Sequence, residues 1–327
     1  MINNNIFSTS CFFMTLKPEQ INEINNLTQQ KNQTIRPVSA ELEEILYQPF
    51  YALDHGFVRV IDYMGNDTSV VQAARVSYGS GTKKTSADIA LINYLMAHKH
   101  TTPFEMCEIK LHIKLPIFIA RQWVRHRTAS INEYSARYSI LEEEFYIPKT
   151  QHLSAQSSIN HQGRNAENTL SESEQQEVLN ILIQDSQHCY QNYLNLINQD
   201  ANGQQLNKDK QGLARELARM NLTLNCYTQW YWKINLHNLL HFLKLRADSH
   251  AQYEIRVYAE IILDIVKKWV PHSYNAFVNY QQNAKSFPQN ALTVLQKLLH
   301  QQPVSQESSG LSQREWQELV DFFKLNL

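Results

Sequence analysis

The fold is decided by the stretch Glu108-Ile109-Lys110-Leu111-His112-Ile113-Lys114-Leu115, in which polar and apolar residues alternate without interruption. A period of two is the signature of a strand with one buried face and one polar face. Strands of this kind are typical of antiparallel sheets, whereas strands of parallel sheets are usually apolar on both faces. The stretch therefore predicts a half-buried strand in an antiparallel sheet.

Further elements are predicted on both sides of this strand. Residues 57–63 predict a second strand, and Asp67 is a candidate N-cap for the helix that follows. Ser86 or Asp88 is expected to begin another helix. After the central strand, Pro116 is suited to the first position of a short helix.

The second half of the chain is mainly helical in pattern, after a long polar connection over residues 151–175. Helices are predicted over residues 174–198, 208–222, 235–246 and 250–269. Residues 226–232 are aromatic and strand-like. Ser312 and Glu315 have the spacing of a capping box and predict a terminal amphipathic helix.

Length and composition exclude several classes of protein. The chain has 327 residues, 43% of them hydrophobic, which is enough for one large domain or two small ones. A formal net charge of -1 argues against a general polyanion binder, and no apolar run is long enough to span a membrane. The four cysteines, at positions 11, 107, 189 and 226, form no CxxC pair, so reduced thiols and a cytoplasmic location are expected.

Polar residues are concentrated immediately after the predicted short helix, in the stretch Arg125-His126-Arg127-Thr128-Ala129-Ser130-Ile131-Asn132-Glu133-Tyr134-Ser135-Ala136-Arg137-Tyr138-Ser139. Guanidinium groups form paired hydrogen bonds with phosphates and with planar carbonyl or imide edges. Ser130, Asn132 and Ser135 are short donors suited to a turn or loop. The stretch is either a solvated basic loop or a binding site for an anionic ligand.

Glycine-rich phosphate loops are absent from the sequence. Residues 77–84 contain two glycines but have neither the GxGxxG nor the Walker spacing, so a plain connection is expected there. A dinucleotide cofactor therefore cannot sit on a Rossmann-type helix start. Its phosphates would have to be held by side chains, for which Arg125, His126 and Arg127 are candidates.

The basic stretch also matches a family pattern, Arg-His-Arg-x-x-Ser-x-Asn-Glu-x-Ser-x-Arg-Tyr, at all nine fixed positions. On this motif the chain resembles the flavin-dependent thymidylate synthases. Three further segments carry the resemblance, which spans roughly residues 57–280: His100-Thr101-Thr102-Pro103-Phe104-Glu105, Arg215-Glu216-Leu217-Ala218-Arg219, and residues 235–250. The fold implied is α+β, an antiparallel sheet flanked by helices, with long helices in the C-terminal half.

The resemblance implies a set of residues that contact FAD: Thr102, Arg125, His126, Arg127, Glu133, Asn235, Leu236, His237 and His241. His100 and Tyr138 are implied on the folate side. Many family members carry Arg where this chain has His237. His237 and His241 could also suggest zinc by their spacing, but no base follows the first His and no third ligand is evident, so no metal is expected.

The resemblance also implies a set of residues that bind the pyrimidine nucleotide: Gln122, Trp123, Val124, Arg125, Glu133, Tyr134, Ser135, Ala136, Arg137, Arg219 and Arg246. Arg246 is the implied catalytic residue, which stabilises negative charge on the base. Gln122 and Arg125 are three residues apart and are expected to share a helical face. After Arg219 the family usually continues with Leu-Pro, whereas this chain has Met220-Asn221.

The implied reaction is the reductive methylation of dUMP to dTMP, with methylenetetrahydrofolate as carbon donor and NADPH as reductant through FAD. No cysteine lies in the basic stretch, so a route without an enzyme cysteine nucleophile is expected. Family members are homotetramers with shared active sites, and no nucleic acid or membrane partner is expected. Residues 1–45 are predicted to be an N-terminal extension, 46–284 the synthase domain and 285–327 a C-terminal helical extension.

Two other functions use the same residues. A nucleotide- or RNA-binding module would bind phosphates with the arginines and stack bases on the aromatic residues 227–232. A flavoprotein with other pyrimidine chemistry would keep the motif but change the reaction. Steep salt dependence without a chromophore would distinguish the first from an enzyme.

Overall fold

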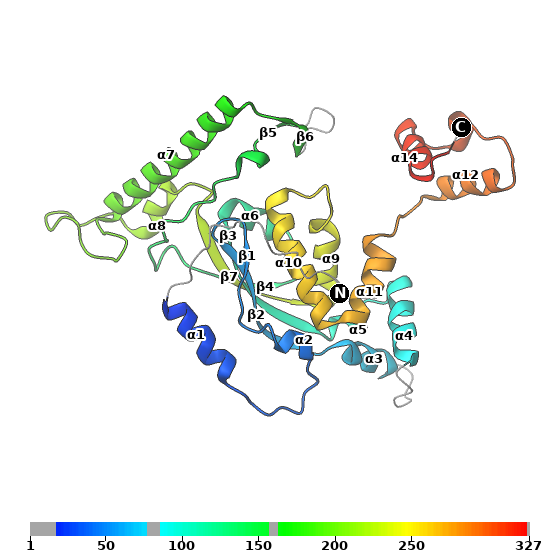
Figure 1. The fold of residues 1–327 in the computed structure, drawn as a ribbon, viewed down its shortest axis with the longest axis horizontal. Coiled ribbons are helices and arrows are strands. Elements are labelled where there is room, and N and C mark those ends of the chain that lie inside the picture. Colours follow the sequence, from blue (N-terminus) through cyan, green and yellow to red (C-terminus); the bar gives the residue numbers. More distant parts are fainter. Residues whose placement is uncertain (1–17, 77–85, 157–162, 326–327) are drawn as a thin grey trace, which may run out of the picture. The chain divides into compact units, whose positions relative to one another are not determined.

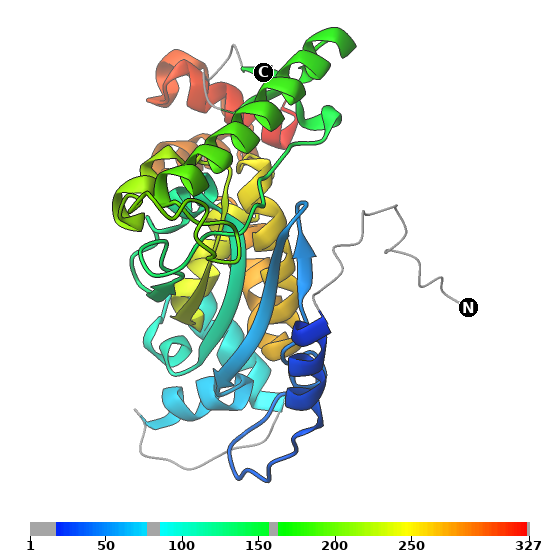
Figure 2. The same ribbon diagram turned by 90° about the vertical axis from the view of Figure 1, so that its left-hand side faces the viewer.

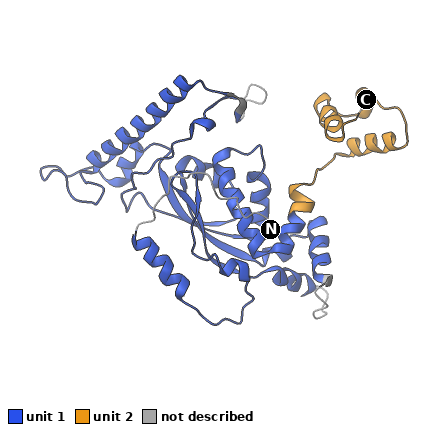
Figure 3. Cartoon of the chain, viewed as in Figure 1, with its two compact units in different colours: residues 1–277 blue, residues 278–327 orange. Residues whose placement is uncertain are grey.

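The computed structural model describes residues 18–76, 86–156 and 163–325. Cys11 and the glycine-containing loop at 77–84 lie outside the described residues, as does part of the polar connection. The chain forms two compact units, Met1–Phe277 and Val278–Leu327 (Figure 3), and each is described by itself. The predicted domain division stays a prediction, since compactness does not define function.

Unit 1 is built on a five-stranded sheet of order β1-β2-β3-β7-β4 (Figure 1). Every neighbouring pair is antiparallel. Its strands are β1 (Phe50–Ala52), β2 (Gly56–Met64), β3 (Glu108–Pro116), β4 (Ser130–Glu133) and β7 (Tyr227–Asn235). The α+β prediction is confirmed, and so is the predicted central strand.

The buried face of the sheet is made by the apolar residues of the alternating stretch. Ile109, Leu111, Ile113 and Leu115 are at most 1% exposed. Leu111 lies between Val60 of β2 and Trp232 of β7 in the register of the strands. The alternation therefore works as predicted, with one row of side chains facing the helices.

Two helices of the C-terminal half pack on this face, α9 (Leu236–Arg246) and α10 (Tyr253–Trp269), as Figures 1 and 2 show. Together with the 26-residue α7 (Glu172–Ile197), they confirm that the long helices lie in this half. Asn235 is the N-cap of α9, and its side chain accepts a hydrogen bond from the Asn238 backbone. The end of β7 thus fixes where α9 begins.

The remaining helices of unit 1 surround these layers. They are α1 (Pro18–Gln29), α2 (Ala40–Glu43), α3 (Asp67–Val76), α4 (Ser86–Ala97), α5 (Thr102–Glu105), α6 (Ile117–Trp123), α8 (Arg215–Ala218) and α11 (Pro271–Phe277). Short 3-10 turns occupy Thr150–His152 and Arg219–Asn221. In the described part of the chain, no helix is long and apolar enough to cross a membrane.

Two predicted helix starts are wrong. Asp67 does not cap its own helix: its buried carboxylate accepts hydrogen bonds from the His272 and Ser273 backbone and the Ser273 hydroxyl. It therefore caps α11, a long-range role that local sequence does not reveal. Pro116 is the last residue of β3 and the N-cap of α6. The helix therefore begins at Ile117, one residue later than predicted.

Three other predictions also need correction. Part of the basic stretch is not a loop but the edge strand β4, which pairs with β7. The polar connection contains a hairpin of β5 (Ser154–Gln156) and β6 (Arg164–Thr169). The helix predicted over 208–222 is reduced to α8 and the 3-10 turn after it, because its first residues are extended or in turns.

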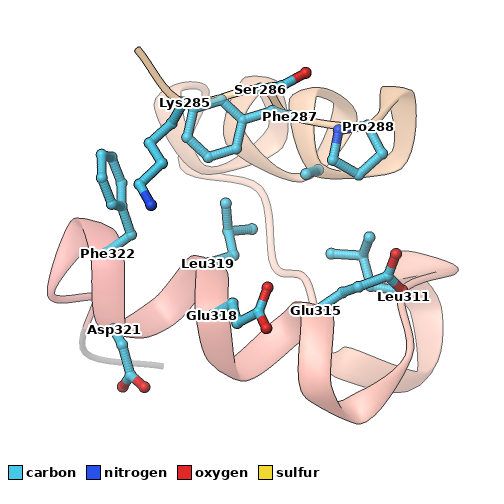
Figure 4. A pocket seen from close by; sticks show the side chains of 11 residues that line it. Lys285, Ser286, Phe287, Pro288, Leu311, Glu315, Glu318, Leu319, Asp321 and Phe322 are labelled. Atoms are coloured by element: carbon cyan, nitrogen blue, oxygen red, sulfur yellow. The ribbon is translucent and has the colours of Figure 1, made fainter. Parts of the chain in front are cut away.

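Unit 2 consists of a π-helical turn, Val278–Gln282, and three helices, α12 (Gln289–Leu299), α13 (Gln306–Ser309) and α14 (Gln313–Phe323). The predicted capping box is confirmed, since Ser312 and Glu315 exchange hydrogen bonds at the start of α14. A groove lies between residues 285–288 and α14, lined by Phe287, Leu319 and Phe322 among others (Figure 4). None of the predicted site residues lines it.

Candidate active site

The last turn of α9 holds the residue expected to be catalytic. Arg246 is the final residue of the helix, where its charge is favoured by the helix dipole. Its Nε donates a hydrogen bond to Nε2 of His126 at 3.0 Å. His126 lies just beyond α6, and its backbone N–H donates to the carbonyl of Trp123. The ends of two helices therefore meet at this side-chain pair.

His126 is neutral at physiological pH in this environment. Burial, followed by the charge of Arg246 and the neighbouring His241, lowers the pKa of His126 to about 4. The rings of His126 and His241 are 6.4 Å apart. His126 is thus a neighbour of both Arg246 and His241. A helical projection places these two residues on different faces of α9.

The basic residues at the start of the stretch have free side chains. Arg125 and Arg127 are exposed, and in the described part of the chain neither guanidinium has an ion-pair or hydrogen-bond partner. Oε1 of Gln122 is buried and also has no partner among the described residues. The shared helical face of Gln122 and Arg125 stays a prediction: α6 ends at Trp123, and the Arg125 backbone N–H donates to the Gln122 carbonyl in the turn that follows. Arg125 is therefore open to a ligand, whereas the Gln122 oxygen is a buried acceptor without a partner in the described ranges.

A second polar cluster begins at the last residue of β4. Glu133 accepts a hydrogen bond from the buried Thr228 hydroxyl at 2.8 Å. Arg137 pairs with Glu216 at 3.1 Å, and the carbonyl of Glu216 accepts a hydrogen bond from Nε of Arg219. The end of the motif and the segment around Arg219, far apart in sequence, are thus adjacent in the fold.

Comparison with known proteins identifies the family. The family model described as "Thymidylate synthase complementing protein" matches residues 59–272. The chain belongs to this family. The match covers the residues of both polar clusters.

Curated relatives and a solved structure agree with the family assignment. A flavin-dependent thymidylate synthase from Rickettsia bellii is 60% identical over 90% of this chain and 99% of the relative. One from Gluconobacter oxydans is 56% identical over 94% and 98%. The UMP/dUMP methylase PolB from Streptomyces cacaoi, solved with 5-Br UMP, is 30% identical with a TM-score of 0.60, covering 70% of this chain and 96% of PolB. The resemblance read from the motif is confirmed.

The two residues expected on the folate side, His100 and Tyr138, and the predicted flavin residue Thr102 lie at exposed positions. His100 is exposed after α4, with its ring 5.8 Å from that of Tyr94. Thr102 is exposed at the start of α5, which packs against α9. Tyr138 is 74% exposed, and its backbone carbonyl accepts a hydrogen bond from Arg215. These side chains are accessible from solvent in the single chain.

Several other implied residues are structural in this fold. The side chains of Trp123 and Leu236 are fully buried, and the Leu236 backbone N–H donates to the Cys107 carbonyl. Asn235 uses its side-chain oxygen to cap α9. Val124 and Ala136 are partly buried. Contact of Trp123 or Leu236 with a ligand would therefore have to come from the backbone.

Several residues that contact the motif were not predicted from the sequence. Thr228, Glu216 and Arg215 each contact the motif, and Phe242 packs against His126 with ring centroids 4.9 Å apart. Thr228 and Phe242 lie in apolar segments and show no signal of their own. Arg215 and Glu216 belong to a segment that carries the resemblance. Their contacts with Tyr138 and Arg137, which lie 77 and 79 positions earlier, cannot be predicted from the sequence.

The aromatic strand does not provide a surface for stacking bases. Trp230 and Trp232 of β7 are at most 2% exposed and Tyr227 is 4% exposed, whereas Tyr231 is 42% exposed. The nucleic-acid alternative thus lacks its stacking residues. In the described residues, no group of three His, Cys, Asp or Glu side chains is arranged to hold a metal ion.

Acid is expected to destabilise the fold through its buried histidines. Burial and the charge of Arg59 lower the pKa of His112 to about 4, and His126 has the same value. Between the unfolded pKa of 6.5 and about 4, the unfolded chain binds more protons, so stability falls as pH falls. The slope is at most about 1.4 kcal/mol per pH unit for each group.

Urea midpoints at about pH 7 and about pH 5 measure this effect. His112→Gln can still accept the hydrogen bond from Arg59 Nε but cannot be protonated. Its midpoint should therefore fall less between the two pH values than that of the unaltered protein. Equal falls in the two proteins would show that His112 does not contribute.

Proposed function

We propose that the protein converts dUMP to dTMP, using methylenetetrahydrofolate as carbon donor and NADPH as reductant, with FAD as its cofactor. The relatives named flavin-dependent thymidylate synthase support the reaction class, and the UMP/dUMP methylase supports a uracil nucleotide as substrate. The observation that carries the proposal is the Arg246–His126 pair beside unpaired Arg125 and Arg127. This arrangement offers fixed positive charge to both a base and a phosphate.

In this proposal Arg246 stabilises the negative charge that develops across N3 and O4 of uracil when C5 becomes nucleophilic. Its guanidinium is held at one end by His126, so the other end can face the base. Gln122, Glu133, Ser135, Arg137 and Arg219 hold the nucleotide. Arg137 and Arg219 are connected through Glu216, so they are placed to act on the same phosphate or sugar.

The residues present fit a flavin dinucleotide. The free guanidinium groups of Arg125 and Arg127 suit its phosphates, and the unpartnered buried oxygen of Gln122 can accept a hydrogen bond from a ligand. Thr102, Asn235, His237 and His241 would hold the rest of the cofactor. Bound FAD, once reduced, supplies the hydride that completes the methyl group.

The buried cysteines are unsuited to act as nucleophiles. Burial raises the pKa of the Cys107 thiol to about 12 and also raises that of Cys226. Both side chains are at most 1% exposed. Nucleophilic attack needs an accessible thiolate, so these two residues support a route in which no enzyme cysteine adds to the base.

Assembly and location belong to the same proposal. We place the enzyme in the cytoplasm as a homotetramer that shares its active sites between subunits. Among the described residues, no hydrogen bond or ion pair joins the Arg246–His126 pair to the second polar cluster around Arg137 and Glu216. This separation is in keeping with active sites that a neighbouring subunit completes. Cys107, Cys189 and Cys226 are unpaired thiols, as is usual in a reducing compartment.

Arg125→Ala is expected to weaken the binding of both dUMP and FAD by about 10-fold or more, because a charge-assisted hydrogen bond is lost in each case. Titration of flavin fluorescence and of dUMP binding measures the two affinities. Arg314→Ala in unit 2 is a matched control, since Arg314 is exposed and, in the described part of the chain, pairs with Glu318 alone. Normal affinity for both ligands in Arg125→Ala would remove this residue from the site.

The experiment that tests the function is the visible absorption spectrum of the purified protein with FAD, followed anaerobically with NADPH and dUMP. A bound-flavin spectrum that bleaches with NADPH, together with dTMP formation in the presence of methylenetetrahydrofolate, is expected. UMP in place of dUMP tests the alternative of other pyrimidine chemistry. A protein that stays colourless with excess FAD would contradict the proposed function.

A further inference from the structure

The guanidinium of Arg246 is used at one edge only. Nε donates to His126, and in the described residues neither terminal nitrogen of Arg246 has a partner. An arginine has two edges for paired hydrogen bonding, one that includes Nε and one formed by the two terminal nitrogens. Because Nε is occupied, the terminal edge is the one left for a planar ligand.

The ring of His126 is fixed by its surroundings. It packs edge-on against Phe242 at 4.9 Å, and Phe242 stacks on Trp123 at 4.6 Å. Trp123 is fully buried, and its carbonyl accepts the His126 backbone N–H. The imidazole is therefore held from both α6 and α9, and a side chain held in this way can orient another.

The hydrogen bond also defines the protonation of the ring. Nε2 can accept from Arg246 only if it carries no proton, so the neutral ring has its proton on Nδ1. The groups facing the ring are the cation Arg246 and His241, both on α9, and both lower its pKa in addition to burial. The environment thus favours the form of His126 that accepts the bond.

We propose that His126 is a positioning residue for Arg246, which fixes the guanidinium so that its terminal edge faces the uracil base. This inference rests on the proposed function and adds a role for His126 beyond any contact with the cofactor. His126 acts through Arg246 and need not touch the substrate. Misplacement of a catalytic group by about 1 Å is enough to cost about 100-fold in rate.

The test is a double-mutant cycle of His126→Ala and Arg246→Ala, read out both as turnover of dTMP and as affinity for dUMP at saturating FAD. His126→Ala is expected to lower kcat by about 10- to 100-fold with a smaller change in KM. In the Arg246→Ala background, the same change is expected to cost less than about 2-fold, because there is no guanidinium left to position.

A conservative variant separates positioning from packing. His126→Gln places a neutral acceptor near the former Nε2 and is expected to recover at least about half of the lost log rate. His188→Gln is the matched control and should turn over normally, because His188 is exposed on α7 and its ring forms a hydrogen bond with Asn192.

Three results would overturn the inference. Losses from His126→Ala that are equal in both backgrounds would show that the two residues act independently. If His126→Gln recovers none of the lost turnover, a hydrogen-bond acceptor at this position is not what holds Arg246 in place. Failure of both His126 variants to take up FAD would assign the ring to the cofactor alone. Absence of dTMP formation by the unaltered protein would instead reject the proposed function, and the dUMP affinities would still test the pairing.

Discussion

Arg246→Ala is expected to lower the turnover of dTMP by about 100- to 1,000-fold, the range seen when a single donor to a developing negative charge is removed. The protein should still fold and bind FAD, because Arg246 is at the end of α9 and is not part of the core. Turnover under saturating substrates and the flavin absorption of the same sample measure the two effects. Arg246→Lys should recover little of the lost turnover, since lysine lacks the planar paired donors of a guanidinium.

Lys244→Ala is the matched control for this change. Lys244 is exposed on the same last turn of α9 and has no partner among the described residues. The substitution therefore removes a positive charge from the same helix end. Its activity should be close to that of the unaltered enzyme. Normal turnover in Arg246→Ala, or an equal loss in Lys244→Ala, would show that the activating role given to Arg246 is wrong.

Trp123→Ala is expected to reduce the free energy of unfolding by about 3–5 kcal/mol, the usual cost of deleting a large buried aromatic ring. Trp123 is fully buried, and its ring contacts those of Trp230, Trp232, Phe242 and Tyr258. Urea denaturation followed by circular dichroism measures the change. Activity should also fall, because Phe242 and His126 lose the ring that supports them.

Tyr231→Ala controls for the loss of an aromatic residue from the same region. Tyr231 is 42% exposed on β7 and makes one ring contact, with His112. Its removal should cost about 1 kcal/mol or less, as expected for a partly exposed side chain. A Trp123→Ala protein as stable as Tyr231→Ala would mean that the aromatic cluster is not the main support of the site.

The fold could be predicted where local pattern and tertiary packing agree. The alternation at 108–115 and the capping box at Ser312 are complete within a few residues, and both are confirmed. Asp67 failed for the opposite reason, since its partners, His272 and Ser273, are more than 200 positions away. The edge strand β4 was missed because short polar residues carry little strand propensity, and pairing with β7 decides its conformation.

The candidate site shows the same limit. The family motif pointed to His126 and Arg137, and the segment at 235–250 pointed to Arg246, because sequence patterns record residue types in order. It did not show that Arg246 donates to His126 or that Arg137 pairs with Glu216, because these pairs join segments 120 and 79 positions apart. Which end of a guanidinium is free depends on such pairs and can be read only from the folded chain.

The position of β4 at the edge of the sheet separates what the strand contributes to folding from what it contributes to function. The strand hydrogen-bonds only to β7, and all four of its residues are exposed. Mutations there disturb no second ladder of hydrogen bonds and leave no cavity, in contrast to the tryptophans of β7, which are buried in the core. Ser130, Asn132 and Glu133 are nevertheless fixed positions of the family motif, so substitutions on this strand are expected to cost function while the protein stays folded. The two demands on the strand are therefore separate: its backbone serves the fold, and its side chains serve the ligand.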